Sequence, residues 1–224
     1  MAIKKCHGVR YDVFKTREQW LAARGKTIGG SDAGSILGLC KWRDNVKLWR
    51  IMVGFEDPED ISDRPFVKYG IDMEPALREV FRNHHPEWAV GYAENNLWTN
   101  KKYEFAHASL DGWIETEDGK YGVVEFKTTT INSRAKNDEW VDRIPDTYYA
   151  QILHYFLVTE FDFAILCAEL KVRKASGEDE WRIVERRIDR ADVKDDIAEL
   201  ERKERGFWWH VQDLTQPALI LPNI

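Results

Sequence analysis

The segments Ser109-Leu110-Asp111 and Glu125-Phe126-Lys127 decide the fold that we expect for this chain. Between them lies Glu117-Asp118-Gly119-Lys120, whose Asp-Gly pair favours a tight hairpin turn, because glycine adopts positive φ without a Cβ clash. Side chains alternate between the two faces of a strand, so Glu125 and Lys127 share one face and Phe126 lies on the other. The stretch therefore predicts two adjacent strands that bring two carboxylates and one amine together.

The carboxylates of Asp111 and Glu125 form a charged cluster with the amine of Lys127. Burying such a cluster costs several kcal/mol unless the charges are paired or bound to a cation. Carboxylate oxygens suit Mg²⁺, which commonly takes one or two protein carboxylates and keeps several waters. We interpret the cluster as typical of a metal-dependent phosphodiesterase. The same short pattern also fits a solvated hairpin edge, because motifs of this length often match by chance.

The composition predicts one α/β domain. With 224 residues, 43% of them hydrophobic, the chain can bury a sizeable core, and we expect a single domain over residues 1–224. It has no apolar run long enough to span a membrane, and residues 1–8 lack the apolar stretch of a signal peptide, which predicts a cytoplasmic protein without a membrane partner. The widely spaced Cys6, Cys40 and Cys167 fit neither a disulfide framework nor a zinc site, so we expect packing thiols.

The charge is uneven along the chain. The net charge is -6, yet residues 1–54 carry eleven Lys and Arg against four acids, which leaves that segment at +7 and the remainder at -13. A basic segment on an acidic body is compatible with a local surface that follows phosphates. We expect the segment 1–60 to face DNA, although an ordinary solvated basic face fits the same charges.

Capping signals predict the first helices. Thr16, with Gln19 three residues later, forms a capping box that opens a helix ending at Arg24. The pair Gly29-Gly30 precedes a candidate N-cap at Ser31. Free N–H groups at the start of the following helix would suit an anion.

Hydrophobic periodicity predicts the remaining elements. Helices are expected over 44–53, 65–84 and 148–159, and a closing helix is expected to bury Val193, Ile197, Leu200, Phe207, Trp208 and Val211. Strands are expected over 88–98, 105–115 and 121–129 as a meander, and over 163–172 and 181–188 as a pair. Glu74 lies inside the apolar stripe of the helix 65–84, so its carboxylate needs a partner such as a metal ion unless it is partly exposed.

Two histidine motifs carry no catalytic signal. His84-His85 precede Pro86 with no third ligand nearby, which favours a helix C-terminal pair over a zinc site. His107 lies near the strand of Asp111 but too far from a Ser/Asp relay for a triad.

The order of the motifs resembles the PD-(D/E)XK nuclease core, here with Leu110-Asp111 in place of the usual Pro-Asp. More narrowly, the chain resembles the lambda exonuclease, or YqaJ-like viral recombinase, family. The matching motifs are Trp20-Leu21-Ala22-Ala23-Arg24, Ile28-Gly29-Gly30-Ser31-Asp32, Ser109-Leu110-Asp111-Gly112, Glu125-Phe126-Lys127 and Tyr149-Ala150-Gln151-Ile152. The resemblance spans residues 14–170. It implies an α/β (α+β), restriction-endonuclease-like fold in which helices flank a central mixed sheet, with the catalytic core over 62–172 and a C-terminal strand and helix over 180–224.

The resemblance implies a metal-dependent deoxyribonuclease with two Mg²⁺ ions, for which Mn²⁺ would substitute. The implied metal ligands are Glu74, Asp111, Glu125 and the backbone carbonyl of Phe126. Two such ions activate water and stabilise the leaving oxygen of an in-line displacement. Lys127 would orient and deprotonate the attacking water, and Gln151 would help to position it.

The resemblance also implies how DNA is bound. Arg24, Ser31 and Ser109 would form a pocket for the 5′-terminal phosphate, which suits a guanidinium fork and hydroxyl donors. This pocket implies a 5′-to-3′ exonuclease that digests one strand of linear duplex DNA and leaves a 3′ single-stranded tail for recombination by a single-strand annealing protein. The segment Lys41-Trp42-Arg43 is a candidate for touching the duplex.

The resemblance further implies a ring-shaped homotrimer around DNA, and a phage or prophage origin with activity in the bacterial host cytoplasm. The segment Phe207-Trp208-Trp209 is a candidate for one of the contact patches of the ring, although docking of the last helix onto its own core explains the same residues. A base-stacking role is less favoured, because the tail is acidic.

Two other functions remain open. A restriction-type endonuclease would share the metal core but would be expected to carry an extra recognition element, and a strand and one acidic helix are all that we see beyond residue 170. A non-catalytic DNA-end-binding module would keep the basic front half and lose an acidic ligand, yet Asp111, Glu125 and Lys127 are all present.

Overall fold

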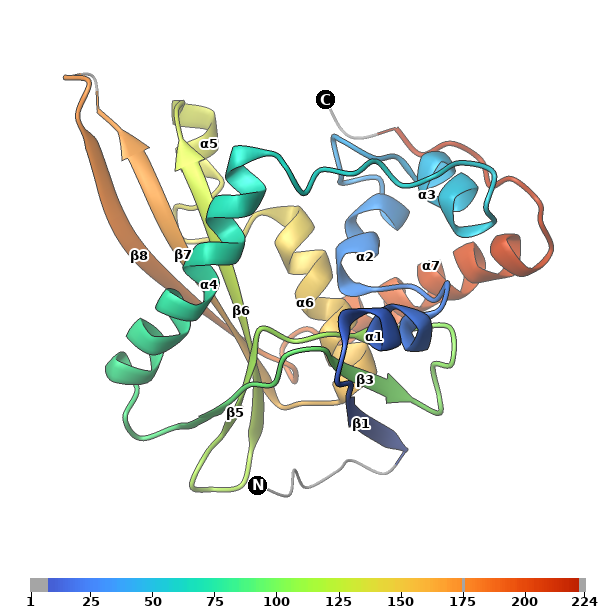
Figure 1. Ribbon diagram of the computed structural model, residues 1–224, viewed down its shortest axis with the longest axis horizontal. Helices are drawn as coiled ribbons and strands as arrows, with labels where there is room; N and C mark the ends of the chain where they lie inside the picture. The colour runs from blue at the N-terminus through green and yellow to red at the C-terminus, as the bar shows by residue number, and fades with distance from the viewer. Residues whose placement is uncertain (1–7, 175, 222–224) are drawn as a thin grey trace.

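A computed structural model describes residues 8–174 and 176–221 of the chain (Figure 1). Five strands form a mixed sheet in the order β2-β5-β6-β7-β8. They are β2 (Ala89–Gly91), β5 (Gly112–Glu115), β6 (Tyr121–Ile131), β7 (Phe163–Arg173) and β8 (Asp179–Asp189). Only β6 and β7 run parallel among these neighbours, and α6 (Asp146–Thr159) makes the crossover between them. The predicted fold class, a central mixed sheet flanked by helices, is confirmed.

The hairpin predicted between the two acidic segments is present. Strands β5 and β6 pair antiparallel from Gly112 opposite Val124 to Glu115 opposite Tyr121, and Gly119 in the turn has a φ of 78°. The pair β7 and β8 also forms as predicted, with antiparallel register along its whole length.

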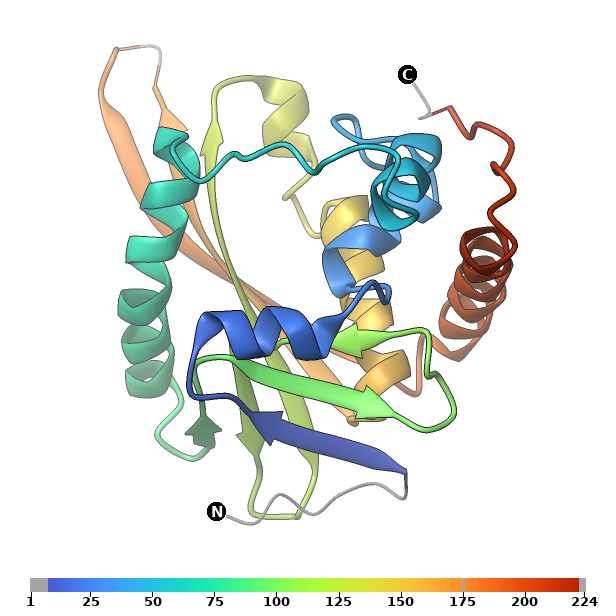
Figure 2. The same cartoon turned by 45° about the vertical axis from the view of Figure 1, so that its right-hand side comes forward.

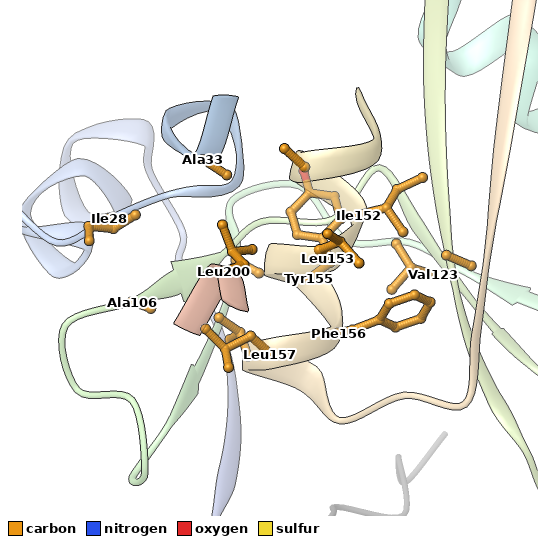
Figure 3. Packing of buried hydrophobic residues seen from close by; sticks show 14 of the residues in the cluster. Ile28, Ala33, Ala106, Val123, Ile152, Leu153, Tyr155, Phe156, Leu157 and Leu200 are labelled. Atoms are coloured by element: carbon orange, nitrogen blue, oxygen red, sulfur yellow. The ribbon is translucent and has the colours of Figure 1, made fainter. Parts of the chain in front are cut away.

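The two faces of β6 are covered by different helices (Figure 1). Val124 and Phe126 pack against α4 (Pro65–His84), in a cluster with Leu77 and Phe81. Val123 points to the other face, where Figure 3 shows it beside Phe156 of α6. The alternation predicted for this strand is therefore confirmed, and it places Glu125 and Lys127 on the α6 side.

Further helices pack on the far side of α6, away from the sheet (Figure 2). They are α2 (Gly30–Ile36) and α7 (Lys194–Gln212). Helix α7 buries Ile197, Leu200, Phe207 and Val211, as its periodicity predicts. Trp209 instead stays 55% exposed. The described residues contain no helix that is long and apolar enough to cross a membrane.

A second, smaller sheet corrects the predicted meander. Strands β1 (Val9–Val13), β3 (Asn96–Asn100) and β4 (His107–Ala108) pair antiparallel in the order β1-β3-β4. The segments 88–98 and 105–115 are thus each split between the two sheets. The segment 105–115 is divided because the side-chain amide of Asn96, and not a neighbouring strand, pairs with the backbone of Leu110. This buried amide accepts from the N–H of Leu110 and donates to its carbonyl, at 2.9 Å each.

The N-terminal helices follow their capping signals with one exception. Helix α1 (Arg17–Arg24) begins with the Thr16 cap, and α3 (Asn45–Met52) begins with Asp44 as its cap. The predicted N-cap at Ser31 is wrong. Gly29 takes that position, because its N–H donates to the carboxylate of Asp32 at 2.9 Å.

Two further details differ from the sequence-based expectation. Helix α4 has the predicted bounds, but of the residues whose spacing predicts its apolar stripe (Phe66, Tyr69, Met73, Leu77, Val80 and Phe81), Phe66 and Tyr69 are exposed. A short helix α5 (Arg134–Asp138) was not predicted. Cys167 is buried as expected, and Cys6 lies outside the described residues.

Candidate active site

The structure brings four of the predicted charged residues to one cavity of about 380 Å³. Glu74 reaches it from α4, Asp111 from the turn before β5, and Glu125 and Lys127 from β6. Phe126 also lines the cavity. Residues from three separate parts of the chain therefore meet where the sequence analysis expects them.

The loop that carries Asp111 is fixed on both sides. The N–H of Phe126 donates to Oδ2 of Asp111 at 2.9 Å, and Nε of Arg78 donates to the backbone carbonyl of Asp111 at 3.0 Å. Arg78 also forms an ion pair with Glu74. Burial raises the pKa of the Asp111 carboxyl well above its usual value, and the nearby carboxylates of Glu125 and Glu74 raise it further.

Glu125 is 2% exposed and is the centre of a hydrogen-bonded group. Its Oε1 pairs with the ammonium of Lys127 and accepts from Nε2 of Gln151 at 2.7 Å. Nε2 of Gln151 also lies 2.6 Å from the hydroxyl of Tyr155. Burial alone would lower the pKa of Lys127, but the carboxylates of Glu125 and Asp111 raise it above its usual value.

The donor set fits a hard divalent cation. Oε2 of Glu125 is buried and has no hydrogen-bond partner among the described residues, which is costly for a carboxylate oxygen unless a ligand satisfies it. Asp111 and Glu125 supply the one or two carboxylates that Mg²⁺ commonly takes. The described residues contain no group of three or more His, Cys, Asp or Glu side chains placed to hold a metal ion, and Glu74 is paired with Arg78.

A second cluster joins two of the three residues predicted to bind a phosphate. The guanidinium of Arg24 lies over the ring of Trp20, 4.4 Å from its centroid. The indole Nε1 of Trp20 donates to Oγ of Ser109 at 3.2 Å. Ser109 is itself held by Asn96, whose backbone carbonyl accepts from its hydroxyl at 2.9 Å. Ser31 lies on the exposed start of α2.

The glycine pair at the start of α2 allows close approach between the clusters. A Cβ on Gly29 would lie 3.0 Å from Nε2 of His107 and 3.6 Å from Nη2 of Arg24. A Cβ on Gly30 would lie 2.6 Å from the ring of Tyr155, which contacts Gln151 of the first cluster. Packing thus explains Gly30, because real Cβ contacts essentially never reach 2.6 Å, whereas a Cβ on Gly29 would require its neighbours to shift by a few tenths of an ångström.

The three candidate DNA-contacting residues have different surroundings. Trp42 is 90% exposed, and Lys41 is exposed beside it. Arg43 instead forms an ion pair with Asp32 at 2.7 Å and donates to Oγ of Ser35 at 3.0 Å, so it braces α2.

The sequence analysis missed the supporting roles of Arg78, Asn96 and Tyr155. Arg78 had a usable signal, because it lies four residues after Glu74 and therefore on the same helix face. The roles of Asn96 and Tyr155 depend on contacts across the fold, for which the local sequence gives no signal.

Comparison with known proteins identifies the family. The model of the YqaJ-like viral recombinase domain matches residues 19–162. The chain belongs to this family. The uncharacterized protein YqaJ of Bacillus subtilis (strain 168) is 30% identical over 156 residues, which cover 69% of this chain and 46% of that protein. The chain thus spans less than half the length of this relative.

Solved structures share the fold. An alkaline exonuclease from Laribacter hongkongensis, also solved in complex with dAMP, has a TM-score of 0.60 and 16% identity, with 88% of this chain and 94% of that chain covered. A phage-related exonuclease from Haemophilus somnus 129PT has a TM-score of 0.54 and 15% identity, with 84% and 95% covered. At these identities the similarity shows the fold alone.

Proposed function

We propose that this recombinase-family domain is a metal-dependent deoxyribonuclease of the PD-(D/E)XK type that degrades one strand of linear duplex DNA from its 5′ end. The observation that carries the proposal is the cavity lined by Glu74, Asp111, Glu125 and Lys127. The fold shared with two exonucleases and the membership of a viral recombinase family support it.

The residues of the cavity have separate roles in this proposal. Asp111, Glu125 and the carbonyl of Phe126 would hold one Mg²⁺, and Glu74, which is paired with Arg78, would serve a second ion. Bound divalent ions lower the pKa of water and neutralise charge on the phosphate. Lys127 and Gln151 already converge on Oε1 of Glu125. Divalent ions bound beside Lys127 would depress the pKa of its ammonium, so that its neutral amine could orient the attacking water and take up the proton. Gln151 would help to position that water.

The second cluster supports a 5′-to-3′ polarity. A terminal phosphate carries two negative charges and is well matched by a guanidinium with hydroxyl donors. Arg24 and Ser109 supply these groups, and Ser109 lies in the same short segment as Asp111. Capture of the 5′ phosphate there would place the first phosphodiester near the cavity, so that digestion runs from 5′ to 3′.

The product and the partners follow from this polarity. Digestion of one strand leaves a 3′ single-stranded tail, which is the substrate of a single-strand annealing protein, and the viral recombinase family of the chain supports a role in phage or prophage recombination. A ring-shaped homotrimer would let the enzyme stay on its substrate. Trp209 is the exposed residue of the aromatic tail that remains available for such a contact, because Phe207 is buried against the core.

Linear duplex DNA labelled at either 5′ or 3′ end tests the proposal against the endonuclease alternative. With Mg²⁺, we expect early release of the 5′ label, late loss of the 3′ label and no cleavage of covalently closed circular DNA. Cleavage of the closed circle would favour a restriction-type endonuclease. Binding of ends without any Mg²⁺-dependent release would favour a non-catalytic module.

A further inference from the structure

The guanidinium of Arg24 is held in a defined orientation. Its Cζ lies over the ring of Trp20, and its Nε donates to Nε2 of His107 at 2.9 Å. Over residues 8–174 and 176–221, neither Nη of Arg24 makes a hydrogen bond. The two Nη groups are therefore the donors that remain for a ligand, and their direction is set by the contact at Nε.

The contacts of His107 fix its protonation. The hydroxyl of Thr27 donates its single hydrogen to the carbonyl of Arg24 at 2.7 Å, so at 2.8 Å from Nδ1 of His107 it can only accept. Nδ1 must then carry the proton. Nε2 faces a guanidinium, which has donors only, so Nε2 must present its lone pair. His107 is thus the neutral Nδ1–H form, with both nitrogens in use.

The backbone of His107 is fixed from the interior. Nε2 of His154 donates to the carbonyl of His107 at 2.9 Å, and Nδ1 of His154 donates to Oε1 of Glu204 at 2.7 Å. Burial alone would lower the pKa of His154, but the charge and hydrogen bond of Glu204 raise it above its usual value, which favours a charged His154 paired with the Glu204 carboxylate where both side chains are fully buried. Helix α7, through Glu204, therefore helps to set the position of a residue next to Arg24.

We propose that neutral His107 is a positioning residue that holds Arg24 in the orientation that binds the 5′-terminal phosphate of DNA. This rests on the proposed function, in which Arg24 meets that phosphate. A guanidinium free to rotate about its long side chain would lose side-chain entropy on binding, whereas one held at Nε and packed over the Trp20 ring has already lost much of that entropy. The 3% exposure of His107 protects the contact from water.

The electrostatics support the neutral form. Burial, followed by the nearby charges of Arg24 and His154, lowers the pKa of His107 to about 3. The imidazole consequently keeps its acceptor throughout the neutral and alkaline range.

Equilibrium binding of 5′-phosphorylated and 5′-hydroxyl duplex DNA to the full chain, in EDTA to prevent cleavage, tests the proposal. The wild type should prefer the phosphorylated end by about ten- to a hundredfold, as expected for charge-assisted contacts. His107→Phe keeps a ring but removes the acceptor, and the preference should fall about tenfold. His107→Gln places an amide oxygen near the position of Nε2 and should restore most of the preference for the phosphorylated end. His84→Phe, which changes an exposed histidine elsewhere, should keep the wild-type preference.

The outcomes separate the two proposals. A wild type that binds both ends equally overturns the phosphate pocket itself. A wild-type preference that survives in His107→Phe overturns the positioning role and leaves the pocket standing. If His107→Phe does not fold, the ¹⁵N resonances of the imidazole in the wild type decide. They should show a protonated Nδ1 and an unprotonated Nε2, and the opposite tautomer contradicts the proposal.

Discussion

At the scale of single residues, the candidate site depends on charges that the fold holds in fixed pairs. Arg78 ties Glu74 to the loop of Asp111, and Lys127 and Gln151 share one oxygen of Glu125. Glu125 and Lys127 were predictable as neighbours, because their alternation on β6 can be read from the chain. The tautomer of a histidine was not predictable, since it is set by neighbours brought together in three dimensions.

The buried neutral His107 predicts an acid-dependent loss of stability. Its pKa is about 3 in the folded protein and 6.5 as the ordinary value, so the unfolded chain binds more protons between these limits. Its contribution to the free energy of unfolding is therefore complete above about pH 6.5 and is lost as the pH falls towards about 3. Urea unfolding between pH 4 and 8 should show that the free energy of unfolding falls less towards low pH in His107→Gln than in the wild type. Parallel pH curves for the two proteins would contradict a buried, neutral His107.

At the scale of elements, local signals predict bounds well where a helix or turn is self-contained. Helix α4 starts at Pro65 and ends at His84 as its sequence indicates, and the Asp-Gly turn gives the β5–β6 hairpin. The break at residues 109–111 was missed because the side chain of Asn96, distant in sequence, takes the place of a strand. Tertiary contacts of this kind have no local signature.

The contact between α2 and α6 predicts that Gly30 tolerates no side chain. Gly30→Ala would force a Cβ to within 2.6 Å of the Tyr155 ring, and overpacking should cost about 1–3 kcal/mol of unfolding free energy. Gly206→Ala in α7 is the matched control, because its Cβ meets nothing within 4 Å. It should stabilise the protein by about 0.5–1 kcal/mol. Thermal unfolding of both variants checks the difference, and equal melting temperatures would contradict the close packing.

At the scale of the whole molecule, a large hydrophobic cluster joins residues from Val9 to Val211, and a separate, smaller one with Leu77, Phe81 and Phe126 packs α4 against the sheet beside the candidate cavity. Figure 2 shows how α6 stands between the sheet with Glu125 and the helices α2 and α7. The motif order along the chain was enough to predict this mixed-sheet architecture. The separation into two sheets was not predictable, because it depends on which strands pair.

The proposed ring gives a prediction about assembly. We expect a mass near three times the 26.3 kDa of the chain in size-exclusion chromatography with light scattering. Trp209→Glu, which places a charge on the exposed tail residue, should shift the mass towards the monomer if Trp209 lies in the contact. A monomer for the unchanged protein at micromolar concentration, together with distributive digestion in the presence of competitor DNA, would contradict the ring.

We propose that the cavity around Asp111 and Glu125 performs Mg²⁺-dependent hydrolysis of DNA. Nucleotide release from 5′-phosphorylated linear duplex DNA should require Mg²⁺ and should be abolished in Asp111→Asn, Glu125→Gln and Lys127→Met while DNA-end binding and thermal unfolding remain close to wild type. Glu117→Gln, an exposed change on the neighbouring hairpin, should keep full activity. Release of nucleotides at near wild-type rates by any of the three cavity variants would contradict the account.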